Sequence, residues 1–235
     1  SARFLHLSMK SKEKVLVTSE GTEITSTLPQ IAFYYMITVA ATGKGSAQRS
    51  FSYSKTSGWE AVSEWTLPTV LESEARALAE NLRKGRRAPK QKLDVITGSE
   101  IVGIAVHESV GHPYEADRIL GREAAQAGES FVTREMVGTE IGSDAVTVVD
   151  DPRVEGSPGY YLYDDEGVKA RKRILIKNGV INEFLYNRES ASILGTESNA
   201  SARASNYDRE PLVRMSTTYM LPGDYGEKEL FEDVK

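Results

Sequence analysis

The chain has 235 residues, of which 40% are hydrophobic and 27% charged, a length and composition typical of a globular protein with one large or two small domains. Its formal net charge of −5 gives no overall attraction to nucleic acid, and without cysteine these residues hold no disulfide, cysteine nucleophile or thiolate ligand. No apolar run approaches the roughly 20 residues that a membrane span needs, and the polar N-terminus is unlike a signal peptide, so we expect a cytoplasmic protein without membrane or nucleic-acid partners.

The first third of the chain is predicted to be an antiparallel β-meander. Lys14–Ile24 reads as two short strands around a turn at Glu20–Gly21, and Ile31–Ala41 reads as a long strand rich in aromatic and β-branched residues. An alternating stretch at Ala47–Thr56 follows it. Pro29 is expected to precede the long strand, where it would not remove a ladder hydrogen bond.

The clearest predicted helix covers Pro68–Lys84. It has a proline in its first turn, Gly85 directly after its end, and an apolar face made of Leu71, Ala75, Leu78 and Leu82. The basic run Arg83–Arg87 lies at the end of this helix, where positive charge complements the helix dipole.

Residues 86–92, which include Pro89, read as a linker between two domains. We therefore predict a first domain at residues 1–88, a β-meander plus helix, and a second domain at residues 89–235. The expected fold class is α+β: an antiparallel β-rich N-terminal part with a long helix, followed by a mixed α/β region that carries a helix with the motif HExxxH.

The second domain is predicted to begin with a short buried strand at Leu93–Ile96 and a helix with Ser99 as its N-cap. Ala145–Val149 reads as another strand. Asn178–Gly179 separates two further strands and is the strongest hairpin signal in the chain.

Towards the C-terminus, Glu189–Leu194 is predicted to form a short helix and Arg214–Leu221 an extended segment. Glu227–Lys235 begins an amphipathic helix without a stop signal after it, so we expect this chain to be part of a longer protein.

The helix predicted after Ser99 carries the sequence HESVGH at residues 107–112. In the zinc-protease motif HExxH, the two histidines lie about 40° apart around a regular helix and can bind one ion. His107 and His112 are five positions apart, which places them about 140° apart on such a helix. They could not share a metal there.

Two departures from a regular helix would allow a shared metal. A π-type turn would bring residues five positions apart onto one side, or the helix could end near His112. Pro113 cannot donate a hydrogen bond to the carbonyl of Ser109 and disfavours the α conformation at His112, and Gly111 adds backbone freedom. The sequence thus weakens a regular helix at this point.

Glu108 is the natural candidate for a general base that accepts a proton from a metal-activated water. Glu115 and Asp117 are candidates to orient an imidazole N–H. A histidine on a helix is more often an ordinary surface or core residue, so the spacing alone leaves both interpretations open.

The motif and its surroundings resemble the TldD/PmbA family, whose members carry the run H-E-x-x-G-H-x-x-E-x-D that residues 107–117 match. Members of this family are often labelled modulators of DNA gyrase and are thought to be metalloproteases. The resemblance covers residues 93–224 well, and the β-rich first third is similar to the family's middle region more loosely. Further segments in family order are residues 146–151, 164–167, 174–179, 211–215 and 218–224.

The resemblance implies a TldD-type metallopeptidase that cleaves peptides or unfolded protein segments. It also implies a two-subunit assembly, either a homodimer or a heterodimer with a PmbA-like subunit. Carried over to this sequence, His107 and His112 would be ligands of zinc, with iron as a second choice, and Glu108 would be the catalytic base. The family's third ligand is a cysteine far toward the C-terminus, and this chain contains none. Either that ligand lies beyond these residues, toward the C-terminus, or this member differs from the family. The family's N-terminal domain is also expected outside these residues. We expect the fragment alone to bind metal weakly or not at all and to be inactive.

A catalytically inactive peptide-binding or regulatory subunit of the same family is the alternative, with strand edges that capture an extended peptide. Nucleic-acid binding has little support, because the chain is acidic and carries no recognisable nucleic-acid motif. The acidic turn Asp164–Glu166 could bind a cation, but a turn of this kind before a glycine is more often solvated loop. Asn199–Arg209 reads as a long polar loop in which Arg203 or Arg209 could hold a peptide carboxylate.

Overall fold

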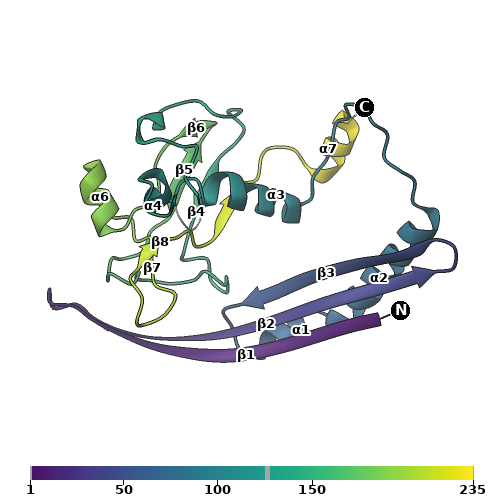
Figure 1. The fold of residues 1–235 in the computed structure, drawn as a ribbon, viewed down its shortest axis with the longest axis horizontal. Helices are drawn as coiled ribbons and strands as arrows, with labels where there is room; N and C mark the ends of the chain where they lie inside the picture. Colours follow the sequence, from purple (N-terminus) through teal and green to yellow (C-terminus); the bar gives the residue numbers. More distant parts are fainter. Residues whose placement is uncertain (1, 125–127, 235) are drawn as a thin grey trace. The chain divides into compact units, whose positions relative to one another are not determined.

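The computed structural model describes residues 2–124 and 128–234, which form two compact units (Figure 1). Unit 1 consists of Ser1–Val15, Thr25–Lys92 and Gly156–Pro158, and unit 2 consists of Leu16–Ile24, Leu93–Glu155 and Gly159–Lys235. The domain division between residues 88 and 89 stays a prediction. None of the helices in the described part of the chain is long and apolar enough to cross a membrane.

Unit 1 is built on a three-stranded sheet in the order β1-β2-β3, with β1 at Ala2–Val17, β2 at Glu23–Ala41 and β3 at Gly45–Lys55 (Figure 1). The first two strands are much longer than predicted, and Pro29 lies inside β2 rather than before it. Antiparallel pairing with β3 begins only at Ile31, so Pro29 removes no hydrogen bond from that ladder.

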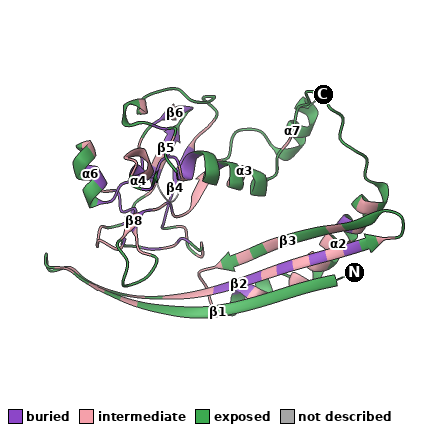
Figure 2. Cartoon of the chain, in the orientation of Figure 1, coloured by how far each residue is buried: buried purple, intermediate pink, exposed green. Residues whose placement is uncertain are grey.

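Two helices follow the sheet, α1 at Glu60–Glu64 and α2 at Leu67–Lys84. Alternate residues of β2 are buried (Figure 2) and pack with the predicted apolar face of α2; this cluster comprises Phe33, Tyr35, Ile37, Val39 and Leu78, with Leu71, Ala75 and Leu82 at its margin. The prediction of this helix and its buried face is confirmed. Gly85 follows α2 in an extended rather than a left-handed conformation, with φ −55° and ψ 142°.

Unit 2 contains a four-stranded antiparallel sheet in the order β6-β5-β4-β9, formed by β4 at Val148–Asp150, β5 at Arg173–Lys177, β6 at Val180–Ile181 and β9 at Thr218–Met220. The predicted hairpin is confirmed: Asn178 and Gly179 connect β5 and β6 with φ values of 48° and 77°. A two-stranded sheet pairs β7 at Ala202–Arg203 with β8 at Leu212–Val213.

The helical elements of unit 2 are short. They are α3 at Ser99–Val106, the π-helix η1 at His107–Gly111, α4 at Ala116–Ile119, the 3-10 helix η2 at Arg134–Met136, α6 at Arg188–Leu194 and α7 at Glu227–Asp233. All of them except α7 contribute residues to one apolar core shared with the strands, which includes Val106, Val110, Tyr114, Leu175, Phe184 and Val213.

Two predictions at the start of unit 2 are wrong. Leu93–Ile96 is not a buried strand: these residues form no strand, and Leu93 and Val95 are 53% and 74% exposed. Four residues bury their apolar side chains as a strand only where neighbouring strands receive them, and within the described chain none pairs here. Ser99 is the first residue of α3 rather than its cap, a position that Gly98 takes.

Candidate metal centre

The HExxxH motif lies on a π-helical turn. The α-helix α3 ends at Val106, and the N–H of His112 then donates to the carbonyl of His107, five residues earlier, at 3.1 Å. A π turn brings residues five positions apart onto the same side. The imidazole rings of His107 and His112 accordingly lie side by side, with centroids 4.7 Å apart and planes at 85°.

The backbone of His112 corrects one expectation. Pro113 was expected to move this residue out of the α region, but His112 has φ −62° and ψ −46°. The effect of a following proline is a bias of the free backbone. Here the π-type hydrogen bond to His107 and the contacts of the imidazole outweigh that bias.

Gly111 is required by a close approach rather than by its backbone angles. A Cβ at this position would overlap Sδ of Met215 and would lie 3.4 Å from Oγ1 of Thr218. The segment between β8 and β9 therefore runs directly against the π turn. The sequence pointed only to the conformational freedom of this glycine and missed the contact.

Three potential ligands gather on the turn. The ligand atoms of His107, Glu108 and His112 all lie within 4.8 Å of one another, and Nε2 of His107 is 3.9 Å from Oε1 of Glu108. All three side chains reach solvent, with exposed fractions of 49%, 65% and 30%. Two imidazoles beside a carboxylate on an open surface are a donor set that suits zinc or ferrous iron. The three residues predicted for the site are thus brought together.

Glu115 connects His112 to the rest of unit 2. This glutamate is fully buried, and its Oε2 lies 3.3 Å from Nδ1 of His112 and accepts from Nε of Arg118 at 2.7 Å. Its other oxygen accepts the backbone N–H of Met215 at 3.2 Å. Glu115 also forms an isolated parallel bridge with Leu185, so its backbone and its carboxylate are both fixed.

Asp117 does not reach the histidines, contrary to the expectation that it is a candidate to orient one of them. It is fully buried, and Oδ2 accepts the N–H of Val213 at 2.7 Å. Burial raises the pKa of this carboxyl, while the hydrogen bond from Val213 opposes the shift. Asp117 thus holds the end of β8 rather than the site.

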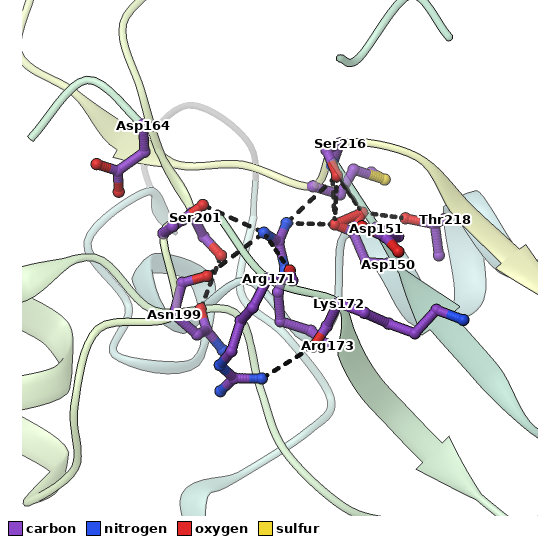
Figure 3. A network of polar contacts seen from close by, with 12 residues as sticks. Asp150, Asp151, Asp164, Arg171, Lys172, Arg173, Asn199, Ser201, Ser216 and Thr218 are labelled. Atoms are coloured by element: carbon purple, nitrogen blue, oxygen red, sulfur yellow. Dashed lines mark hydrogen bonds and ion pairs between the residues drawn. The ribbon is translucent and has the colours of Figure 1, made fainter. Parts of the chain in front are cut away.

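A buried polar network holds the segment between β8 and β9, through Ser216 and Thr218 (Figure 3). Asp150 at the end of β4 accepts the N–H of Ser216 at 2.7 Å and the hydroxyl of Thr218 at 3.2 Å, and it pairs with Arg173 at 2.5 Å. Arg173 also donates to the carbonyl of Ala200 at 3.2 Å. Sequence reasoning missed this network, although charged residues that border apolar strands were a visible signal.

The acidic turn at Asp164–Glu166 is not simply solvated loop. Asp164 is 2% exposed, and its carboxylate accepts the N–H groups of Val168 at 2.8 Å and Ala202 at 3.1 Å. Burial raises the pKa of Asp164, and these backbone hydrogen bonds oppose the shift. The prediction failed because the Asp164 carboxylate binds backbone N–H groups of its own turn and of Ala202 in β7. Local composition does not reveal the second contact.

The segment at residues 199–209 is likewise not a long unstructured loop throughout. Asn199 and Ser201 are buried and hydrogen-bonded to each other, and β7 follows them. Arg203 donates to the carbonyl of Met215 at 2.8 Å and lies over the ring of Tyr161, so its guanidinium is already used within the fold. Arg209 is exposed.

Comparison with proteins of known sequence places this arrangement in a family. A metalloprotease from Methanocaldococcus jannaschii is 35% identical over 223 residues, which cover 95% of this chain and 47% of that protein. A zinc metalloprotease TldD homolog from Saccharolobus solfataricus is 36% identical over 156 residues, 66% of this chain and 33% of that protein. The chain thus spans about half the length, or less, of these curated relatives.

Solved structures show the same fold at low identity. TldE from Thermococcus kodakarensis superposes with a TM-score of 0.64 at 19% identity, over 96% of this chain and 48% of that one. A Thermotoga maritima protein that carries the name putative modulator of a DNA gyrase has a TM-score of 0.65 at 15% identity, over 97% of this chain and 49% of that one.

Residues 90–235 match the PmbA/TldA metallopeptidase C-terminal domain. This stretch contains the π turn, Glu115 and the segment that packs on Gly111, and it is more than half of the chain. The chain therefore belongs to the TldD/PmbA family of metallopeptidases.

Proposed function

We propose that this chain is the ligand-bearing part of a metallopeptidase that hydrolyses peptide bonds in peptides or unfolded protein segments. The observation that carries the proposal is the approach of His107, Glu108 and His112 within 4.8 Å on one solvent-facing turn. Membership of a metallopeptidase family supports the same chemistry.

In this proposal His107 and His112 hold the metal through their imidazole nitrogens. Zinc is the proposed ion and iron the second choice, and the name of the Saccharolobus solfataricus relative supports zinc. When bound, zinc supplies Lewis acidity that acidifies water and polarises a carbonyl group.

Glu108 is the proposed general base. Its carboxylate is 65% exposed and lies beside His107, so it can reach both the attacking water and the substrate. In this role Glu108 takes a proton from the water and transfers it to the amide nitrogen of the leaving peptide. This step needs a flexible, accessible carboxylate, unlike the buried Glu115.

The site needs a further ligand, because catalytic zinc typically has three protein ligands. Within the described residues no other histidine, aspartate or glutamate joins the group of three. We propose that a cysteine outside residues 1–235 completes the site, and that these residues alone bind zinc weakly and do not hydrolyse peptides.

The test measures zinc content and hydrolysis of an unstructured polypeptide with the longest form of the protein that contains these residues. We expect one zinc per chain, retained in Glu108→Gln and lost in His107→Ala and His112→Ala. Hydrolysis should fall at least about 100-fold in Glu108→Gln and stay unchanged in the surface control Glu135→Gln. Undiminished hydrolysis by Glu108→Gln would contradict the role of this residue. Binding of unfolded peptide without any metal would instead favour the alternative, a non-catalytic peptide-binding subunit.

We further propose that the active form contains two subunits, either two copies of this protein or one copy with a PmbA-like subunit, and that it is cytoplasmic. The likeness in fold to TldE supports a partner of the same family. Size-exclusion chromatography with light scattering should give the mass of a dimer, alone or with that subunit. A monomer under both conditions would contradict the assembly.

A further inference from the structure

We propose that Glu115 is a positioning residue for His112: its buried carboxylate accepts the Nδ1–H of the imidazole and so leaves Nε2 without a proton and able to act as a ligand. The use made of Nε2 rests on the proposed function. The position of the proton is a property of the chain itself and can be measured without any metal.

Two groups compete for Nδ1 of His112. Oε2 of Glu115 and Nη2 of Arg118 each lie 3.3 Å from it. The two groups favour opposite tautomers, because a carboxylate only accepts a hydrogen bond and a guanidinium only donates one. A proton on Nδ1 satisfies Glu115 and leaves the lone pair of Nε2 for a ligand bond, whereas a bond from Arg118 to Nδ1 moves the proton to Nε2.

Burial decides this competition in favour of Glu115. Its carboxylate is fully buried and accepts from the N–H of Met215 and Nε of Arg118. Nη1 of Arg214 forms an ion pair with Oε2 at 3.6 Å. These partners leave one of the roughly four acceptor positions of a carboxylate for the Nδ1–H of His112. With the proton on Nε2, the lone pair of Nδ1 would face this buried carboxylate at 3.3 Å, an unfavourable contact between two acceptors.

Arg118 loses little in this arrangement. Its side chain is 16% exposed and therefore not cut off from solvent, and its Nε already donates to Glu115 at 2.7 Å. An N–H group of Arg118 that gives up Nδ1 can bind water at low cost, whereas water does not reach the buried contact between the carboxylate and a lone pair of Nδ1. Arg118 therefore fixes the carboxylate, and the carboxylate fixes the imidazole.

The carboxylate of Glu115 is held rigidly enough for this role. Arg118 binds one of its oxygens, the backbone of Met215 binds the other, and the backbone of Glu115 pairs with Leu185. The orientation of His112 is thus linked to the segment that packs against Gly111. An oriented imidazole is the usual effect of a carboxylate behind a metal-binding histidine.

The test is side-chain ¹⁵N NMR of His112 in the metal-free chain, at a pH of about 8.5 where neutral histidine dominates. We expect His112 to have its proton on Nδ1 in the wild type, and mainly on Nε2 in Glu115→Ala. In Glu115→Gln, which keeps the shape and loses the charge, the share of the Nδ1–H tautomer should fall. Asp164→Asn is the matched control: this carboxylate is also buried, and it accepts backbone N–H groups of Val168 and Ala202, so its loss should leave His112 unchanged.

The wild-type spectrum alone can overturn the proposal, even if a variant fails to fold. A proton on Nε2 of His112 in the wild type would mean that Nδ1 accepts a hydrogen bond from Arg118, and it would refute the role of Glu115. An unchanged tautomer in a folded Glu115→Ala would refute it equally. Failure of the wild-type protein to bind zinc would count against the proposed function and would not alter either tautomer result.

Discussion

Arg173 and Asp150 form an ion pair in which Nη2 lies 2.5 Å from Oδ2 and both side chains are fully excluded from solvent. The same carboxylate binds the N–H and the hydroxyl of Ser216. The pair therefore ties β4 and β5 to Ser216 (Figure 3), in the segment between β8 and β9 that packs against Gly111.

Removal of one partner of this pair should be strongly destabilising. Arg173→Met leaves a buried carboxylate without its counter-charge, and we expect the free energy of unfolding to fall by about 3–5 kcal/mol, measured by urea denaturation. Arg171→Met is the control, because Arg171 pairs with Glu183 at the surface, where such a pair contributes about 1 kcal/mol or less. A loss below 1 kcal/mol in Arg173→Met, on the scale of a surface pair, would show that hydroxyl and backbone donors satisfy Asp150 by themselves.

Gly111→Ala should be destabilising because its new methyl group overlaps Sδ of Met215. We expect a loss of about 1–3 kcal/mol in unfolding free energy, typical of overpacking. The loss should be smaller in a Met215→Ala background, where the overlap is relieved. An equal loss in both backgrounds would exclude Met215 as the cause.

Gly103→Ala supplies the matched control for Gly111→Ala. Gly103 lies inside α3, and a Cβ there would meet nothing within 4 Å. Alanine has the higher helix propensity, so this substitution should stabilise the chain by about 0.5–1 kcal/mol. Opposite signs for the two glycines would separate the effect of packing from that of backbone freedom.

Tyr114 and Tyr161 should respond in opposite ways to the loss of their hydroxyl groups. The buried hydroxyl of Tyr114 has no hydrogen-bond partner in the described part of the chain, whereas that of Tyr161 donates to the carbonyl of Ala200 at 2.7 Å. Tyr114→Phe should therefore be neutral or stabilising by up to about 1 kcal/mol, and Tyr161→Phe should lose about 1 kcal/mol in thermal or urea unfolding.

Alkaline titration adds a second measurement on Tyr114. Burial raises the pKa of its hydroxyl to about 12, so the contribution of Tyr114 to stability is present below its ordinary value of 10.0 and is lost as the pH rises through about 12. In Tyr114→Phe, this part of the fall in unfolding free energy at alkaline pH should be absent. A phenolate that titrates near the ordinary value in the folded chain would contradict the burial.

Asp117 should make stability depend on pH in the acid range. Burial raises its pKa above the ordinary value of 3.8, and its Oδ1 has no hydrogen-bond partner among the residues that the structure covers. A carboxyl with a raised folded-state pKa contributes stability that is present below the ordinary value and is lost as the pH rises through the folded value. The unfolding free energy of the wild type minus that of Asp117→Asn should thus be larger at about pH 4 than at about pH 7. A difference that does not change with pH would contradict this assignment.

Local sequence signals predicted those elements whose geometry depends on a few neighbouring residues. Asn178–Gly179 formed the expected hairpin because both positions need positive φ, which these two residues adopt readily. The apolar face of α2 was likewise readable from its spacing alone. The five-residue separation of His107 and His112 indicated that a regular helix would not serve, and the structure has one of the two alternatives, the π turn.

Features that depend on distant partners were not readable. Leu93–Ile96 looks apolar enough for a strand, but residues 2–124 and 128–234 provide no strand that pairs with it. Asp164 looks like part of a solvated turn, but it binds the backbone of Ala202. The contact between Gly111 and Met215 is of the same kind, because nothing near either residue in the sequence indicates the other.

The hydrogen bonds from Val213 to Asp117 and from Met215 to Glu115 have a consequence for chain length. The two donors are two positions apart, so their N–H groups point to the same side of an extended segment, while the two acceptors lie at the N-cap and in the first turn of α4. Insertion or deletion of one residue between Val213 and Met215, or between Glu115 and Asp117, would separate one carboxylate from its N–H group. Between Val213 and Met215 it would also change the side of the extended segment that faces the π turn. The exposed loop between β7 and β8 lies outside both pairs, so a change of its length would leave the two hydrogen bonds in register.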